Sequence, residues 1–265
     1  MTSFATAHVP ITSHQADTAA RALAEEEGKR AHVVIALTGA HAYGFPSPDS
    51  DLDLKGVHVL PTRRLVGLAR PGEHASRMEV IAGVEIDYAS NEIGQVLHGL
   101  LRGYGSYYER LLGMWILRSS AEHAALVPLV QRSFSRRVYA HYHGFATGQY
   151  REAEASGMPT AKKLLYVLRT ALTGAHLLAS GRLVTDLTAL MDEHGFASAR
   201  ELLEIKLTGE RAPLPAPVAA RWLAEARRAF EILDGARDGS PLPDEAPNAD
   251  ELEAWLIELR RARFD

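Results

Sequence analysis

The chain has 265 residues, of which 46% are hydrophobic and 23% charged, and its formal net charge at pH 7 is −4. This composition is typical of a globular protein and argues against an intrinsically disordered chain. The acidic balance excludes a global positive field for nucleic acid, so a polynucleotide partner would need a local basic patch. Because cysteine is absent, disulfides, thiolate metal sites and a cysteine nucleophile are excluded.

The N-terminal residues, Met1 to Ser13, have no basic segment followed by a long apolar core. They therefore do not predict a secretory signal. No run approaches the ~18 apolar residues that are needed to span a bilayer. Together with the lack of cysteine, these features favour a cytoplasmic protein without a membrane partner.

The first part of the chain changes between helical and extended patterns. Residues 13–30 have the spacing of an amphipathic helix, and residues 32–37 (HVVIAL) predict a buried strand. Residues 38–51 are rich in Gly, Pro, Ser and Asp and predict a loop. A second strand is expected over 52–60, and the proline that follows it opens a short helix over 61–67.

Two further strands are expected at 77–82 and 84–89, on either side of Gly83. In the second of these strands the apolar residues alternate and share one face. Glu85 and Asp87 therefore share the opposite face.

From about residue 90 onward the sequence predicts no strand, and apolar residues recur with helical spacing. Runs of strands followed by runs of helices indicate an α+β fold: a small α/β domain with a short mixed sheet over residues 1–125, then a helical domain over 126–265. Residues 238–248 contain three prolines and predict a linker. After a first helix that starts near residue 93, helices are expected over 107–117, 122–155, 160–180, 184–194, 198–208, 216–235 and 248–263.

The segment most informative about chemistry runs from residue 37 to residue 61 (LTGAHAYGFPSPDSDLDLKGVHVLP). A phosphate loop of the G-x-x-x-x-G-K-[ST] type is one interpretation, since Gly39 and Gly44 have that spacing. Phe45 and Pro46 stand where this motif needs Lys and Ser or Thr, so both the positive charge and the Mg²⁺ ligand are missing. We reject this interpretation.

A calcium loop of the EF-hand type is a second interpretation, because Asp49, Asp51 and Asp53 match its opening. The sixth position should be Gly and is Leu54, and the twelfth should be Glu and is Leu60. Apolar residues also alternate with the acids, which is the period of a strand, so we reject this interpretation too.

A third pattern fits better: a strand, a small-residue turn, about ten residues, and then two acids separated by one residue on the next strand. Gly39 and Ala40 form the turn, and eleven residues separate Gly39 from Asp51. The spacing by two places the carboxylates of Asp51 and Asp53 on one face of the strand. Such a pair could hold divalent cations, because Mg²⁺ prefers carboxylate and phosphate oxygens.

The run from Gly39 to Asp53 (GAHAYGFPSPDSDLD) resembles the predicted nucleotidyltransferases of RNA repair operons, a branch of the DNA polymerase beta superfamily. Residues 84–112 resemble the third-strand acid and the following helix of that family. On this match Asp87 would be the third carboxylate, with Glu85 on the same strand face as the alternative, and Glu109 fits a family glutamate. The resemblance implies transfer of NMP from an NTP to a hydroxyl with release of pyrophosphate, using Mg²⁺ or Mn²⁺.

Residues 162–181 (KKLLYVLRTALTGAHLLASG) resemble a later helix of the same family. Lys162, Tyr166 and Arg169 are spaced so that one helix face can present them together. The resemblance implies that they face the nucleotide, whereas an exposed basic face is the alternative. Lys55 and Arg64 could approach phosphates or lie on the surface.

The chain departs from the family at Ala40, where a serine hydroxyl is expected to help hold the triphosphate. Backbone N–H groups can still bind phosphate oxygens there. The acceptor implied by the resemblance is an RNA end, a protein hydroxyl or a small molecule. A non-catalytic nucleotide-binding or toxin-neutralising module is the alternative function, and Ala40 is the residue that favours it.

Other catalytic motifs are missing. The twelve histidines include no H-E-x-x-H, and His141 and His143 are two apart on a predicted helix, so they do not share a face. No zinc site is predicted from these spacings. G-x-S-x-G is also absent, so a serine hydrolase is unsupported.

Overall fold

A computed structural model describes residues 10–68, 72, 74–209 and 213–264. The prediction that there is no secretory signal rests on the N-terminal residues, and the first nine of them lie outside the described part. Within that part, the strands form one mixed five-stranded sheet in the order β3-β4-β2-β1-β5. The strands are β1 (Ala31–Thr38), β2 (Leu52–Val59), β3 (His74–Ile81), β4 (Val84–Glu92) and β5 (Ile116–Ser119).

The central strands decide which side chains meet at the site. β2 pairs with β4 in parallel, and this register sets Asp53 directly beside Asp87. The other neighbouring pairs are antiparallel. Leu52 and Leu54 are fully buried, as strand alternation predicts. Their burial leaves Asp53 on the opposite face of β2.

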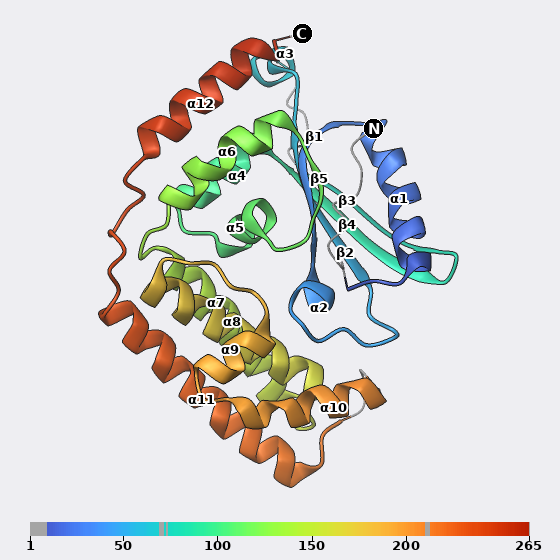
Figure 1. The fold of residues 1–265 in the computed structure, drawn as a ribbon, viewed down its shortest axis with the longest axis vertical. Coiled ribbons are helices and arrows are strands. Elements are labelled where there is room, and N and C mark those ends of the chain that lie inside the picture. The colour runs from blue at the N-terminus through green and yellow to red at the C-terminus, as the bar shows by residue number, and fades with distance from the viewer. Residues whose placement is uncertain (1–9, 69–71, 73, 210–212, 265) are drawn as a thin grey trace.

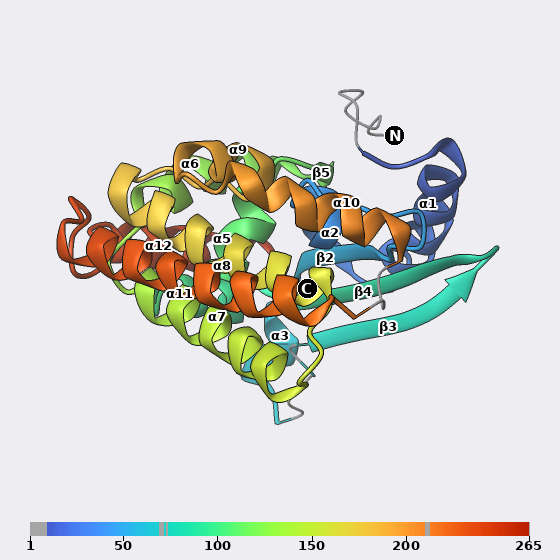
Figure 2. The same cartoon turned by 90° about the horizontal axis from the view of Figure 1, so that it is seen from below.

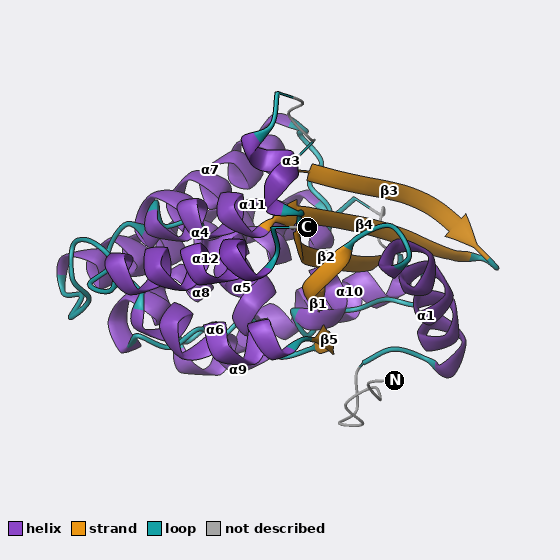
Figure 3. Cartoon of the chain, turned by 90° about the horizontal axis from the view of Figure 1, so that it is seen from above, coloured by secondary structure: helices purple, strands orange, loops and turns teal. Residues whose placement is uncertain are grey.

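Helices cover both faces of the sheet (Figures 1 and 3). α1 (Ser13–Glu27) packs on one face, where Leu23 joins Leu52 and Leu54 in an apolar cluster. Thr12 and Gln15 form a capping box that fixes the start of this helix. The opposite face is covered by α4 (Ile93–Leu101), α5 (Gly105–Leu112) and α6 (Ala121–Arg132).

In the helical part, α8 (Ala161–Ser180) is the central helix and packs against both α7 (Val138–Ala155) and α11 (Ala216–Asp238), which Figure 2 shows alongside it. Most of α8 is buried along its whole circumference, because apolar and small residues continue around it. This explains why its leucines are core residues. The helical part also contains α9 (Leu187–Glu193), α10 (Arg200–Thr208) and α12 (Ala249–Ala262).

The C-terminal end of the described chain returns to the sheet. α12 reaches α3 (Thr62–Val66), where the Thr62 N–H donates to the Arg263 carbonyl at 2.7 Å. An ion pair of 2.7 Å also joins Arg260 to the buried Glu92 at the end of β4. The predicted α+β fold is confirmed. The predicted boundary at 125/126 falls inside α6, and the division into two domains stays a prediction.

Three sequence predictions need correction. The strand β5 lies in a region where no strand was expected, because only one of its four residues, Leu117, is buried and the alternation signal is too short. The predicted helix over 122–155 is two helices, because the first of them ends next to Ser133. The Ser133 carbonyl accepts a hydrogen bond from the Tyr108 hydroxyl. The predicted loop over 38–51 contains the short helix α2 (Gly39–Ala42). No helix among the described residues is long and apolar enough to cross a membrane.

Candidate active site

Two of the predicted carboxylates meet on the face of the sheet opposite α1. The Lys55 ammonium lies between them, 3.3 Å from Asp53 Oδ1 and 2.7 Å from Asp87 Oδ2. This contact follows from strand periodicity, because Lys55 shares a face with Asp53 and the parallel register brings Asp87 alongside. The position between the two acids therefore attracts a cation.

The electrostatics of this face are unfavourable for three ionised acids. Burial, together with the negative charges of Asp51 and Asp87, raises the pKa of Asp53 to about 6, even though Lys55 lowers it. Desolvation and like charges both oppose ionisation of a carboxyl group. A divalent cation would favour the charged form, and carboxylate oxygens are the ligands that Mg²⁺ takes. In this structure Lys55 lies between Asp53 and Asp87, and the oxygens of Asp51, Asp53 and Asp87 do not all lie within 4.8 Å of one another.

A glycine holds the turn against this carboxylate. Gly39 has φ +68°, and a Cβ added there would lie 1.8 Å from Asp53 Oδ2. Any side chain at position 39 would therefore displace the Asp53 carboxylate and also adopt a backbone conformation that L-residues disfavour. Ala40 follows and is buried in the core, 1% exposed.

Two cavities adjoin the carboxylates. The larger, about 720 Å³, is lined by Asp51, Lys162 and Tyr166 among others. The smaller, about 190 Å³, is lined by Gly39, Asp53, Lys55 and Tyr166 among others. Tyr166 borders both, so the structure brings the predicted residues of α8 together with those of β2. Glu85, the alternative to Asp87, lines the larger cavity.

Arg169, the third predicted residue of α8, is placed differently. It is buried and does not line either cavity. Its Nη1 pairs with Glu109 Oε1 at 2.8 Å, and its guanidinium lies 3.6 Å from the centre of the Tyr43 ring. Burial lowers the pKa of Arg169, but Glu109 and the neighbouring tyrosines Tyr43, Tyr142 and Tyr166 together raise it more, so the net direction is upward. The sequence indicated Arg169 and Glu109 as separate candidates and did not predict that they form an ion pair with each other.

Glu109 is fully engaged. It accepts hydrogen bonds from the hydroxyls of Tyr43, at 3.0 Å, and Tyr142, at 3.3 Å. Tyr43 ends the Gly39 turn, and Glu109 lies on α5. The Arg169–Glu109 pair therefore ties α8 and α5 to the turn beside the carboxylates.

A buried lysine that the sequence analysis missed holds the loop before Asp51. Lys206 of α10 is 1% exposed and donates to Ser47 Oγ at 2.8 Å and Ser50 Oγ at 3.2 Å. Its ammonium also lies 5.9 Å from the centre of the Phe45 ring. The signal that could have found it is the pair of serines in the acidic loop, which needs a donor once the loop is buried.

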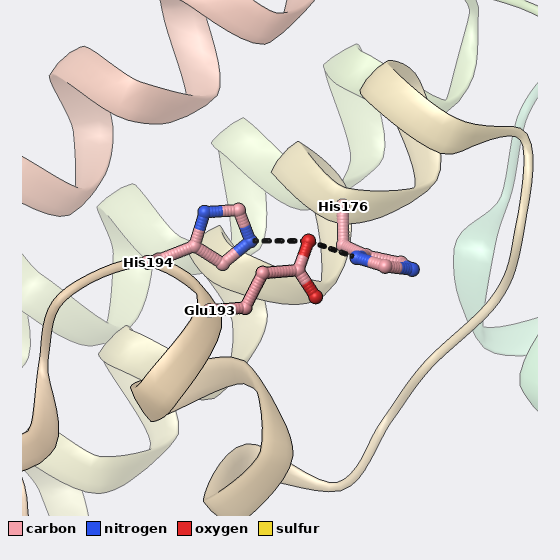
Figure 4. A group of neighbouring side chains, drawn as sticks. All are labelled: His176, Glu193 and His194. Atoms are coloured by element: carbon pink, nitrogen blue, oxygen red, sulfur yellow. Dashed lines mark hydrogen bonds and ion pairs between the residues drawn. The ribbon is translucent and has the colours of Figure 1, made fainter.

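A second group of metal-ligand types lies on the helices (Figure 4). His176 Nδ1 is 2.7 Å from Glu193 Oε1, and His194 Nε2 is 3.8 Å from the same oxygen. Their donor atoms lie within 4.8 Å of one another, which is a donor set that Zn²⁺ accepts. No spacing motif predicts this group, because His176 comes from α8 and the other two from the end of α9. The hydrogen bond from His176 to Glu193 accounts for their contact without an ion.

The mixed sheet with its helical companion is the fold expected of a protein of the DNA polymerase beta superfamily. The chain belongs to RlaP, the RNA repair pathway DNA polymerase beta family, which it matches over residues 15–258. The predicted resemblance to this branch of the superfamily is thereby confirmed.

The chain is also similar to individual proteins. An uncharacterized protein of Methanocaldococcus jannaschii is 28% identical over 159 residues, which are 59% of this chain and 64% of that relative. The match therefore spans slightly less than two thirds of the relative's length. A solved structure, the nucleotidyltransferase-like protein from Exiguobacterium sibiricum 255-15, aligns with a TM-score of 0.33 and 10% identity, covering 96% of this chain and 81% of that chain.

Proposed function

We propose that the protein is a Mg²⁺-dependent nucleotidyltransferase that moves NMP from an NTP to a hydroxyl acceptor and releases pyrophosphate. One observation carries this proposal. Asp53 and Asp87 lie in register on adjacent parallel strands with the Lys55 ammonium between them, and the Gly39 turn lies against Asp53. Family membership supports the same reaction class.

The residues have separate tasks in this proposal. Asp51 and Asp53 would hold the cations, and Asp87 would complete the ligand set next to the attacking hydroxyl or accept its proton. Bound Mg²⁺ or Mn²⁺ would supply the positive charge that stabilises the attacking and leaving oxygens. Lys55 already neutralises part of the negative charge on this face.

The nucleotide would occupy the larger cavity. Lys162 and Tyr166 line it together with Asp51, which suits a charged triphosphate next to a base or ribose. The backbone N–H groups at Gly39 and Ala40 would meet phosphate oxygens. Arg169 would act indirectly, by fixing Glu109 and Tyr43 behind the turn.

The decisive experiment replaces Asp51 with Asn. Each α-³²P-labelled NTP would be incubated with Mg²⁺ and total RNA, and label transfer and pyrophosphate release would be measured. Loss of a metal ligand that supplies several kcal/mol should lower transfer by ~10³-fold or more. Asp49→Asn is the matched control, since Asp49 lines the same cavity outside the alternating pair. Near-normal transfer by Asp51→Asn would disprove the assignment.

A non-catalytic nucleotide-binding or toxin-neutralising module is the second candidate. It is favoured by Ala40, which offers no hydroxyl to the triphosphate. Mg²⁺ with NTP should raise the melting temperature under either function. NTP binding without pyrophosphate release, in both the natural chain and Ala40→Ser, would support the module. Release that increases in Ala40→Ser would support the enzyme.

A further inference from the structure

A third cavity, of about 1010 Å³, opens between α5, α7 and the sheet. We call it the aromatic groove, because Tyr104, Tyr107, His141 and Phe145 line it. Tyr104 is 41% exposed and Phe145 is 58% exposed. Large rings left open in a cavity, rather than packed in the core, indicate a surface that binds something flat and apolar.

The rings of the groove form a short series. His141 lies 4.5 Å from Phe145 with 36° between their planes, and 6.4 Å from Tyr104 with 30° between their planes. Burial lowers the pKa of His141 to about 4, so at pH 7 it is a neutral ring. Successive aromatic faces of this kind are the surfaces on which proteins stack nucleobases without reading sequence.

The groove also carries positive charge in a chain whose net charge is −4. Arg102 lies 5.6 Å from the ring centre of Tyr104, and Arg110 lies 5.3 Å from that of Tyr107. Glu152 is the acidic residue among the lining residues. Two arginines beside stacked rings provide the local basic patch that an acidic protein needs to bind phosphates.

The position of the groove connects it with the carboxylates. Ser106 and Arg110 line both the groove and the small cavity at Asp53. Glu152 lines both the groove and the larger cavity at Asp51. Asn91, another lining residue, is four positions beyond Asp87 on β4. A molecule in the groove would therefore reach the small cavity at Asp53 and adjoin the proposed nucleotide cavity.

We infer that the aromatic groove binds the end of a single-stranded nucleic acid as the acceptor, with bases stacked on Tyr104 and Phe145 and phosphates on Arg102 and Arg110. This inference rests on the proposed function. In the reaction, a hydroxyl oxygen of the strand forms a bond to the α-phosphorus of the NTP. The bond between that phosphorus and the bridging oxygen breaks, pyrophosphate leaves, and the hydroxyl proton passes to Asp87 or solvent.

Binding can be measured separately from catalysis. Fluorescence anisotropy with 5′-fluorescein-labelled 12-nucleotide RNA, the same DNA sequence and the RNA duplex would be recorded in EDTA without NTP. Both single strands should bind more tightly than the duplex, whose bases are already stacked. Equal or tighter duplex binding would overturn the inference. A preference for RNA over DNA would add that the 2′-hydroxyl is recognised.

Variants assign the binding to the groove. Tyr104→Leu and Phe145→Leu keep apolar bulk but remove the stacking face, and each should weaken binding about tenfold. Tyr150→Leu is the matched control, because Tyr150 lies on the same helix as Phe145 but does not line the groove. Arg102→Gln should reduce the slope of log K against log [salt] by about 0.7. Unchanged binding in both leucine variants would overturn the inference.

The experiment also separates this inference from the proposed function. Tyr104→Leu should keep the thermal stabilisation by Mg²⁺ and NTP, and Asp51→Asn should lose that stabilisation yet bind the RNA normally. Strand binding that survives in Asp51→Asn while transfer is absent from the natural chain would leave the groove standing and refute the enzyme. Nucleotide transfer to a small molecule, with no strand binding, would support the enzyme and refute nucleic-acid binding by the groove.

Discussion

Two ion-pair groups lie near the Gly39 turn, and they differ in how many charges are matched. At Lys55, one ammonium faces two carboxylates, and the side chains of Lys55, Asp53 and Asp87 are 16%, 16% and 30% exposed. At Arg169, one guanidinium faces one carboxylate, and the side chains are 9% and 7% exposed. The first group has excess negative charge that solvent or a cation can reach, and the second has none.

This contrast supports the proposal that the Lys55 group serves chemistry, whereas the Arg169 group stabilises the fold. Glu109 has its charge matched by Arg169 and accepts two tyrosine hydroxyls besides. Asp53 has a raised pKa because burial and neighbouring acids oppose its ionisation. A matched buried pair is costly to break, whereas an unmatched one can accept another cation. Three predictions test this contrast, in order of expected effect.

The largest effect is expected from Arg169→Met, which leaves the Glu109 charge buried without its partner. Breaking a buried pair costs about 3–5 kcal/mol, so the free energy of unfolding should fall by that amount in urea denaturation. Lys162→Met, at the more exposed end of the same helix, is the control and should change it by less than about 1 kcal/mol. Equal effects of the two variants would remove the distinction between the groups.

A smaller effect is expected from pH. The pKa of Asp53 is raised from 3.8 to about 6, so the metal-free folded state binds this proton more strongly than the unfolded state does. Its contribution to stability is fully present below about pH 4 and is lost as pH rises through 6. The loss is about 3 kcal/mol.

Subtracting the urea-unfolding curve of Asp53→Asn from that of the natural chain should isolate this pH dependence. Millimolar Mg²⁺ should flatten it, because a bound cation favours the ionised carboxylate. If the difference in free energy of unfolding stays constant between pH 4 and pH 7, the negative charges around Asp53 are as well neutralised as the charge of Glu109.

The smallest effect is expected from Gly39→Ala. An alanine at φ +68° costs about 1–2 kcal/mol in backbone strain and must also displace the Asp53 carboxylate. Gly83→Ala is the matched control, since it has φ +81° and nothing within 4 Å of the added Cβ. Both variants should lose similar stability from strain, but only Gly39→Ala should weaken Mg²⁺ binding in calorimetry. Equal Mg²⁺ affinity in the two would separate the turn from the metal.

The sequence predicted what local periodicity determines. The alternation of Asp51 and Asp53, the later strand with Asp87 and the helix with Lys162 and Tyr166 all follow from spacing. The structure brings Asp51, Asp53, Lys162 and Tyr166 to two adjoining cavities, and Asp87 contacts Lys55. A short-range pattern is sufficient there because each element presents its side chains with a fixed period.

Other features depend on contacts between distant residues and could not be predicted. Glu109 and Arg169 are 60 positions apart, and their pairing depends on how α5 packs against α8. The aromatic groove combines residues of α5 and α7, and each segment alone predicts only a helix. The four-residue strand β5 forms because it pairs with the edge of β1, and no local pattern in the sequence indicates this pairing.

The contact of Lys206 with Ser47 and Ser50 has a consequence for the evolution of the family. A lysine sealed in the interior is tolerated only while oxygen acceptors surround it, and those acceptors lie more than 150 positions earlier in the chain. Substitution at one of the three sites should therefore be accompanied by change at the others. In an alignment of relatives, positions 47, 50 and 206 should co-vary, and lineages with an apolar residue at 206 should carry apolar or glycine residues in place of the serines.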